Sequence, residues 1–223
     1  MTGTSYWTLK DGTRHPTGYS AEEFAAPYRA ATGAGHEVVV ATPGGVVPYV
    51  DAMSLRPAMA GSAEIALELE QILLSAEELR RPIELADTRL DEYDAVYYPR
   101  GSRPDGGYVE ERRIRPPTHR SARLRQALAI VCHAPAAILA TRRKGVSPFA
   151  GYRVTAYTND EEDAVGLRVK APWTVEDELV KLGVEFTRGE IWKPYTVADR
   201  NLYTGQNPAS AAPLAEQVLA ALH

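Results

Sequence analysis

Three short and continuously apolar segments constrain the fold of this chain most strongly. They are HEVVVATP at 36–43, YDAVYYP at 93–99 and ALAIVC at 127–132. Helical patterns lie between or after them, at 20–34, at 172–183 and from 208 onward. Strands that alternate with helices and are apolar on both faces are typical of a largely parallel sheet with helices on each side. We therefore predict an α/β fold with a mostly parallel central sheet.

Local signals fix some boundaries of the expected helices. Ser20 is the expected N-cap of the first helix, with Glu22 and Glu23 in its first turn. Pro27 lies inside that helix and predicts a kink or a later start. The amphipathic segment 172–183 is expected to end at Gly183. Further strands are expected at 152–157, 184–187 and 202–205, and a helix over 134–143.

The beginning of the sequence does not fit the pattern. A fold of this kind normally opens with an apolar strand, whereas TGTSYWTL follows Met1 directly. Two interpretations stay open: residues 4–9 form a short first strand, or that strand is missing or only partly formed.

Size and composition favour one soluble domain over residues 1–223. The chain is 44% hydrophobic, which suffices for a sizeable core, and no linker divides it. A net charge of -4 gives no reason to expect nucleic acid or an anionic membrane as a partner. No apolar run reaches the roughly 20 residues that span a bilayer, and the first residues do not resemble a secretory signal. We expect a cytoplasmic protein.

The single cysteine, Cys132, lies at the junction of a buried strand and a helix, in LAIVCHAPAAIL. A single cysteine excludes an intrachain disulfide and cysteine-rich metal sites. A nucleophile on a tight strand-to-helix turn is exposed at the carboxyl edge of the sheet, where free helix N–H groups favour a thiolate and can hold an oxyanion. From the residues alone, a buried and inert cysteine remains an equal alternative.

Several motifs together resemble one family. AIVCHAPAAIL is similar to the cysteine elbow of the ThiJ/PfpI superfamily, the cysteine branch of the class I glutamine amidotransferase-like fold. GYSAEEFAAPY, YDAVYYPRG, VTAYTNDEEDAVGL and LYTGQNPASAAPLAEQVL resemble its other motifs in the same order. The last two resemble the heat-shock chaperone and glyoxalase III branch in particular. The resemblance covers nearly the whole chain except roughly 46–90 and 103–120, and it implies a flavodoxin-like three-layer sandwich and a homodimer.

The resemblance also implies site residues. Cys132 matches the nucleophile, His133 the histidine beside it, and Glu162 the acid that orients this histidine. Asp160 and Glu161 are alternatives for that acid. Glu23 matches the glutamate that contacts the sulfur as an acid or base. Read without the resemblance, Glu22 and Glu23 are more simply first-turn acids, and the run NDEED is a solvated helix start.

One loop departs from the family pattern. The family's Pro-Gly-Gly-His reads Pro99-Arg100-Gly101-Ser102 here. The amide of Gly101, with that of His133, is expected near the oxyanion. Arg100 and Arg103 are expected either to point to solvent or to bind an anionic substrate group through paired hydrogen bonds.

The implied function is chemistry on a reactive carbonyl without a cofactor or metal. It resembles the glyoxalase III conversion of a 2-oxoaldehyde such as methylglyoxal to a 2-hydroxy acid. Two alternatives stay open: a specialised lyase, hydratase or hydrolase that acts on a larger anionic metabolite, and a stress chaperone with no essential catalysis. The remaining histidines show no spacing that suggests a metal site.

Overall fold

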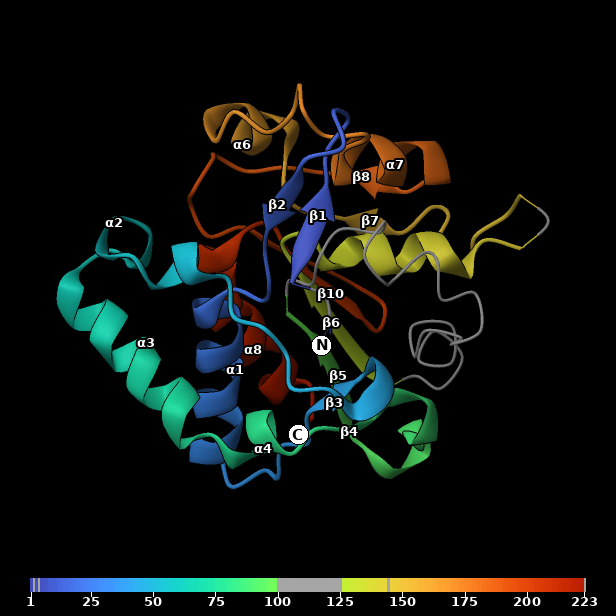
Figure 1. Ribbon diagram of the computed structural model, residues 1–223. Helices are drawn as coiled ribbons and strands as arrows, with labels where there is room; N and C mark the ends of the chain where they lie inside the picture. Colours follow the sequence, from blue (N-terminus) through green and yellow to red (C-terminus); the bar gives the residue numbers. More distant parts are fainter. Residues whose placement is uncertain (2, 4, 100–125, 144, 223) are drawn as a thin grey trace.

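The computed structural model describes residues 1, 3, 5–99, 126–143 and 145–222. Its centre is a four-stranded sheet in the order β5 (Ala95–Tyr98), β6 (Ala127–Val131), β10 (Leu202–Gly205) and β9 (Thr196–Asp199). The first three strands are parallel to one another, and β9 is antiparallel to β10 (Figure 1). The predicted fold class, α/β with a mostly parallel central sheet, is confirmed.

Helices cover both sides of this sheet. On one side α8 (Ala211–Ala220) packs on β6 and β10, and α1 (Ala21–Gly33) packs on α8. On the other side lie the 3₁₀-helix η6 (Ala134–Thr141) and α7 (Val175–Leu182), which contact each other. All five residues of β6 are buried between the two layers, which explains its continuous apolar run.

Close packing between β10 and α8 requires a glycine at the end of the strand. A Cβ on Gly205 would lie 2.9 Å from the Ser210 Cβ and 3.0 Å from the Val131 Cγ2. The carboxyl edge of the central sheet is therefore tightly packed beside Cys132.

In the part of the chain that the structure describes, three small two-stranded sheets lie outside the central one. The pair β1 (Tyr6–Thr8) and β2 (Arg14–Pro16) is antiparallel. The pairs β3 (Ala41–Thr42) with β4 (Ile83–Glu84), and β7 (Arg153–Val154) with β8 (Glu185–Phe186), are parallel. The other helical elements among the described residues are η1 (Pro43–Gly45), η2 (Ala52–Leu55), α2 (Pro57–Ala60), α3 (Ala63–Ser75), α4 (Glu77–Arg80), η3 (Leu85–Asp87), η4 (Leu90–Glu92), α6 (Asn159–Ala164) and η7 (Pro208–Ser210).

The predicted end of α7 and the predicted start of α1 are confirmed, whereas the alternative late start of α1 is corrected. The helix α7 ends at Gly183, which has the left-handed φ of 91° that favours glycine there. The helix α1 begins at Ala21, directly after Ser20, so a late start after Pro27 is wrong. The Ser20 hydroxyl forms no capping bond; instead Ser54 Oγ accepts from the Ala21 N–H at 2.9 Å.

The strand predictions are less accurate where a strand depends on distant partners. The predicted strand 36–43 is reduced to Ala41–Thr42, and 152–157 to Arg153–Val154. Residues 6–8 do form a strand, but it pairs with β2 and not with the central sheet. Among the described residues, the usual first strand of the central sheet is therefore missing. The helix expected over 134–143 is a 3₁₀-helix that ends at Thr141.

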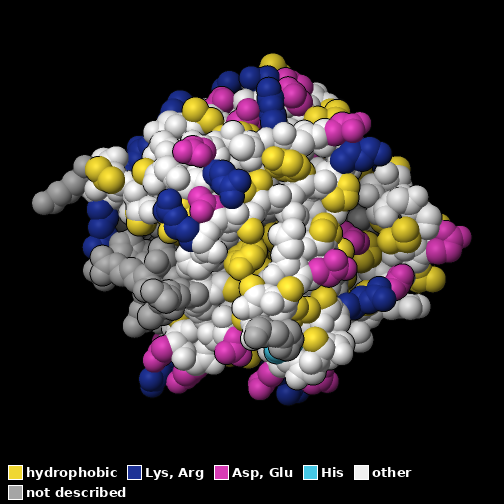
Figure 2. Space-filling view, turned by 180° about the vertical axis from the view of Figure 1, so that it is seen from behind, with side chains coloured by type: hydrophobic (Ala, Val, Ile, Leu, Met, Phe, Trp, Pro, Cys, Tyr) yellow, Lys and Arg dark blue, Asp and Glu magenta, His cyan; other side chains and the backbone are white. Residues whose placement is uncertain are grey.

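Figure 2 shows Lys and Arg side chains interspersed with Asp and Glu over one face, with hydrophobic side chains between them. No single-sign patch dominates this view, in keeping with the small net charge. Among the described residues, none of the helices is both long and apolar enough to cross a bilayer.

Candidate active site

Cys132 lies on a strained turn directly after β6 and two residues before the start of η6 at Ala134. Its φ is 62°, a left-handed conformation that is uncommon for a residue with a side chain. Two backbone hydrogen bonds hold the turn: the Cys132 N–H donates to the Gly205 carbonyl at 2.9 Å, and its carbonyl accepts from the Tyr157 N–H at 2.8 Å. This strand–turn–helix arrangement has the geometry of a nucleophile elbow.

A histidine and a carboxylate continue the line of polar groups from the sulfur. The Cys132 Sγ lies 3.2 Å from His133 Nδ1, and His133 Nε2 lies 3.0 Å from Glu162 Oε1. All three residues are buried, with exposures of 1%, 4% and 0%. Low local polarity strengthens both interactions, and the carboxylate fixes the orientation of the imidazole ring.

Aromatic rings hold His133 from another direction. The Tyr157 ring stacks on the His133 ring at a centroid distance of 4.3 Å, and Trp192 meets Tyr157 edge to face at 5.8 Å. These rings leave little freedom for the imidazole to rotate away from Cys132 and Glu162.

Glu162 is positioned by the short helix α6. The N-cap of this helix is Thr158, which forms a reciprocal capping box with Glu161. The Glu162 N–H donates to the Thr158 carbonyl at 3.0 Å, and the Glu162 carbonyl accepts from Leu167 N–H at 3.0 Å. The backbone around the carboxylate is therefore fixed at both ends.

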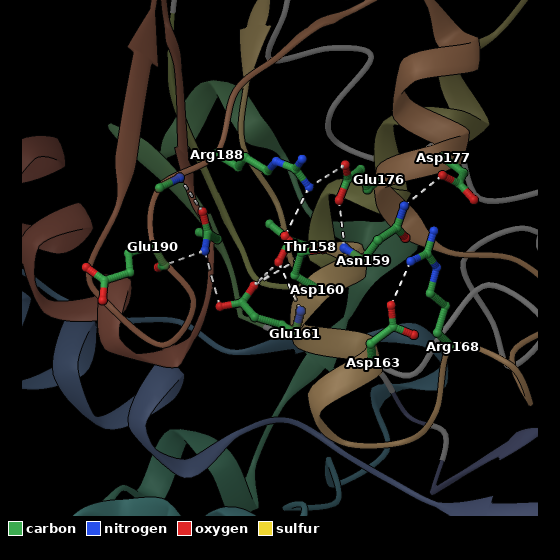
Figure 3. Close-up of polar contacts among 12 residues, drawn as sticks. Thr158, Asn159, Asp160, Glu161, Asp163, Arg168, Glu176, Asp177, Arg188 and Glu190 are labelled. Carbon is green, nitrogen blue, oxygen red and sulfur yellow. Dashed lines mark hydrogen bonds and ion pairs between the residues drawn. The ribbon is translucent and has the colours of Figure 1, made fainter.

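The two alternatives for the acid have other partners (Figure 3). Glu161 is buried, and its carboxylate accepts hydrogen bonds from Thr158, Trp192, Gln206 and Asn207. Asp160 points to solvent and pairs with Arg188 at 3.3 Å. Of the three neighbouring acids, Glu162 is the one that contacts His133. The network around Glu161 was not predicted from the sequence, because Gln206 and Asn207 lie far away along the chain.

Glu23 lies on α1 and is fully buried. It and Cys132 both act electrostatically on the hydroxyl of Tyr97, on strand β5, so the three groups share one region of the molecule. Burial, followed by the charges of Glu23 and Cys132, holds the pKa of Tyr97 well above its usual range. Burial also raises the pKa of Glu22, the neighbour of Glu23.

Tyr97 was missed by the sequence interpretation, which assigned YDAVYYP only to a strand. Its hydroxyl is buried and has no hydrogen-bond partner among the described residues. The signal that could have found it is the register: Tyr97 pairs with Ala129, two residues before Val131, on the face toward α8.

The expected substrate-binding residues Arg100, Gly101 and Arg103 lie outside the described residues. Within the described part of the chain, no group of three or more His, Cys, Asp or Glu side chains is placed to hold a metal ion.

Comparison with known proteins adds a second line of evidence. No family model matches the chain. A segment of 102 residues is 34% identical to the glutathione-independent glyoxalase HSP31 of Saccharomyces cerevisiae; it spans 43% of this chain and 43% of the yeast protein. The chain thus matches less than half the length of this curated relative.

Solved structures match along the whole chain. The crystal structure of glyoxalase III from Candida albicans covers 100% of this chain and 95% of its own, with a TM-score of 0.82 and 23% identity. A ThiJ/PfpI domain protein from Brachyspira murdochii covers 92% of this chain and 91% of its own, with a TM-score of 0.56 and 13% identity. At these identities the structures show a shared fold. The chain therefore has the fold of these proteins, and its matched segment is similar to a glutathione-independent glyoxalase.

Proposed function

We propose that this protein converts a small 2-oxoaldehyde, such as methylglyoxal, to the corresponding 2-hydroxy acid with Cys132 as nucleophile. The observation that carries the proposal is the line Cys132–His133–Glu162 on a left-handed turn, with spacings of 3.2 and 3.0 Å. The partial identity to a glutathione-independent glyoxalase supports the same chemistry.

The burial of Cys132 favours a small substrate. With 1% of the residue exposed, the sulfur can meet a three-carbon dicarbonyl far more readily than a large or polymeric one. The imidazole of His133, supported by the Glu162 carboxylate, can accept the proton of the Cys132 thiol when the thiolate forms.

The reaction balances with water as the only other reactant. The Cys132 thiolate adds to the aldehyde carbon, which gives a hemithioacetal. A base then removes the proton from that carbon, and the resulting enediol is reprotonated at the neighbouring carbon. The product is a thioester of the 2-hydroxy acid on Cys132. Water hydrolyses it, which releases the acid and restores the thiol.

His133 and Glu23 are the proposed proton carriers. His133 receives the thiol proton through Nδ1, while Glu162 stabilises the imidazolium that forms. Glu23, buried near the same site, is proposed to carry the proton between the two carbons. The amide of His133 would support the oxyanion, as a backbone donor at the start of η6.

Incubation with methylglyoxal in the absence of glutathione tests the proposal. We expect stoichiometric loss of methylglyoxal and formation of lactate, and no turnover by Cys132→Ser at an unchanged unfolding midpoint. Asp160→Asn is the matched control, because this neighbouring acid is exposed and pairs with Arg188 only at the surface. Lactate formation by Cys132→Ser at the rate of the unchanged chain would refute the nucleophile.

We further propose that the protein is a cytoplasmic homodimer. A free thiol suits a reducing compartment. Large apolar side chains are exposed in the segment after η1, where Val47, Tyr49 and Met53 are 55%, 55% and 46% exposed. Light scattering during gel filtration should give a mass of two chains, and Val47→Asp with Tyr49→Asp should reduce it to one.

A further inference from the structure

Two strained backbone positions lie at opposite ends of one stack of rings. Among the described residues, three residues other than glycine have a left-handed φ: Cys132 at 62°, Trp192 at 60° and Arg200 at 57°. Arg200 lies in the tight hairpin turn between β9 and β10, which accounts for its conformation. Trp192 lies in the β8–β9 connection, residues 187–195, whose flanking strands do not pair with each other. Strain of this kind persists where surrounding contacts hold it, and it is common at functional sites.

A buried carboxylate holds the backbone of Trp192. Glu161 Oε1 accepts a hydrogen bond from the Trp192 N–H at 3.1 Å. The same oxygen accepts from the side-chain amides of Gln206 and Asn207 at 3.2 and 2.8 Å. Hydrogen bonds to an ionised carboxylate are stronger than those between neutral groups, and burial strengthens them further. The left-handed turn at Trp192 is therefore stabilised from within the protein.

The same two amides fix the β8–β9 connection on both sides of Trp192. Gln206 Oε1 accepts from the Gly189 N–H at 2.9 Å, before the turn. Asn207 Nδ2 donates to the Lys193 carbonyl at 2.9 Å, directly after it. The connection is thus attached to the segment after β10 at several points, and the position of the indole follows from these bonds.

The indole of Trp192 covers the ring that stacks on the imidazole. Its ring meets the Tyr157 ring at 5.8 Å and 67°, and the Tyr157 ring stacks on His133 at 4.3 Å and 30°. Exposure falls inward along this line, from 38% at Trp192 to 6% at Tyr157 and 4% at His133. The backbone of Tyr157 is also bonded to the elbow, because its N–H donates to the Cys132 carbonyl at 2.8 Å. A shift of Tyr157 would therefore reach both the imidazole and the turn of the nucleophile.

The two polar contacts of the imidazole need this support. Cys132 Sγ lies at Nδ1 and Glu162 Oε1 lies at Nε2, so both contacts depend on the direction of the ring plane. Hydrogen bonds weaken as their angles depart from linearity, so a tilt of the ring weakens both at once. A flat contact on the face of the ring opposes such a tilt, and Tyr157 provides one.

We propose that Trp192 is a positioning residue that acts through Tyr157 to hold the His133 imidazole in line with the thiol. The bonds from Glu161 keep the Trp192 backbone in its left-handed turn and so keep the indole against Tyr157. Since Glu161 and Glu162 are neighbours on α6, one short helix supplies both the acid that pairs with His133 and the anchor of its ring stack. The expected effect on turnover rests on the proposed function, whereas the placement of the ring does not.

Two substitutions of Trp192 separate its ring from its backbone. Trp192→Asn removes the indole but keeps a residue type that tolerates a left-handed φ, and Trp192→Phe keeps an aromatic ring. With methylglyoxal we expect kcat to fall by about 10- to 100-fold in Trp192→Asn at an unchanged KM, because only the chemical step needs the aligned imidazole. Trp192→Phe should keep most of the rate. Ile191→Ala is the matched control, since Ile191 is equally exposed on the same connection and has no aromatic ring.

Nuclear magnetic resonance reports the ring stack without any substrate. The ring current of a stacked Tyr157 shifts the carbon-bound protons of the His133 ring upfield, and the loss of these signals in His133→Asn identifies them. We expect them to move downfield in Trp192→Asn and to keep their positions in Trp192→Phe and Ile191→Ala. Unmoved signals in Trp192→Asn would overturn the proposal, and so would moved signals in an active enzyme with an undiminished kcat. If the unchanged chain converts no methylglyoxal and the signals move, the proposed function fails while the positioning role stands.

A double-mutant cycle tests the route through Tyr157. Tyr157→Leu removes the stacked ring but keeps the backbone N–H that bonds to Cys132. If Trp192 acts through Tyr157, adding Trp192→Asn to Tyr157→Leu should lower kcat by less than about twofold more, because the two side chains form one line of contact. Losses of kcat that multiply would show that Trp192 reaches the site by another route, and the proposal would then be wrong.

Discussion

The bond between His133 and Glu162 decides which nitrogen of the imidazole faces the sulfur. When Nε2–H donates to the carboxylate, Nδ1 is left as an acceptor for the Cys132 thiol proton. Glu162→Gln keeps the shape but loses the charge that stabilises imidazolium. We expect kcat to fall by about 10²- to 10⁴-fold, with a changed pH profile and an unchanged fold.

Steady-state kinetics from pH 5 to 9 measure this effect, with circular dichroism as a check on folding. Asp160 lies two residues before Glu162 on the same helix, but its side chain is exposed. Asp160→Asn should therefore leave kcat unchanged. A Glu162→Gln enzyme with the original kcat and pH profile would show that the carboxylate has no part in the reaction.

The Tyr97 hydroxyl gives a second prediction at this scale. It is buried with no hydrogen-bond partner in the described part of the chain, so it carries a desolvation cost. Tyr97→Phe removes the group and should leave the free energy of unfolding unchanged or raise it by about 1 kcal/mol. Urea unfolding checks this, and a loss of more than about 1 kcal/mol would mean that the hydroxyl has a partner.

The helix α6 is attached to neighbouring segments by the side chain of Glu161. The Glu161 carboxylate joins the capping box of α6 to the loop before β9 and to the segment after β10, through Trp192, Gln206 and Asn207. Glu161→Ala leaves these buried donors without their acceptor. We expect a loss of about 3–5 kcal/mol in the free energy of unfolding.

Urea unfolding of Glu161→Ala against Asp160→Ala separates the buried network from the surface. Asp160→Ala removes only an exposed ion pair with Arg188 and should cost less than about 1 kcal/mol. Comparable losses of unfolding free energy in the two variants would show that the buried hydrogen bonds of Glu161 do not stabilise the fold. Because Glu162 follows directly, Glu161→Ala should also lower activity by displacing the carboxylate from His133.

The elements that the sequence predicts well are those with local causes. The run at 127–131 is apolar throughout because β6 is buried on both faces, and α7 ends where Gly183 adopts a positive φ. Cys132, His133 and Glu162 were brought together by motif resemblance alone, since 29 residues separate the last two. The strand predicted over 36–43 is shorter in the structure, because a strand forms only where a neighbouring strand pairs with it. The sequence of residues 36–43 contains no information about that neighbour. The Glu161 network was missed for the same non-local reason.

For the whole molecule, when residues 1–223 are prepared with a free amine at Met1, the buried Met1 nitrogen predicts a pH dependence of stability. Its pKa is about 5 in the folded chain, lowered by desolvation from 8.0. Between these values the unfolded chain binds a proton that the folded chain does not. The free energy of unfolding should therefore rise with pH, by about 1.4 kcal/mol per unit from pH 5 to 8, and level off above.

Acetylation of the Met1 nitrogen provides the comparison. The acetylated chain should lack this slope, so the difference between the two chains should grow as pH falls toward 5. Parallel curves over pH 5 to 8 would show that the nitrogen is hydrated in the folded chain.

Residues 1–223 are also predicted to unfold as one domain. Thermal unfolding should give a single transition, with equal calorimetric and van't Hoff enthalpies. Two separate transitions would show that the part containing β3 and β4 folds independently of the central sheet.

The stack of rings beside His133 gives the site its own optical reporter. Trp192 packs against Tyr157, and Tyr157 stacks on the imidazole at an interplanar angle of 30°, so Tyr157 connects the surroundings of the indole to His133. We therefore expect the emission of Trp192 to change when His133 takes up a proton during turnover. With Trp7 and Trp173 replaced by Phe, stopped-flow fluorescence would record the proton on His133 as it arrives and leaves, with no dye and no label.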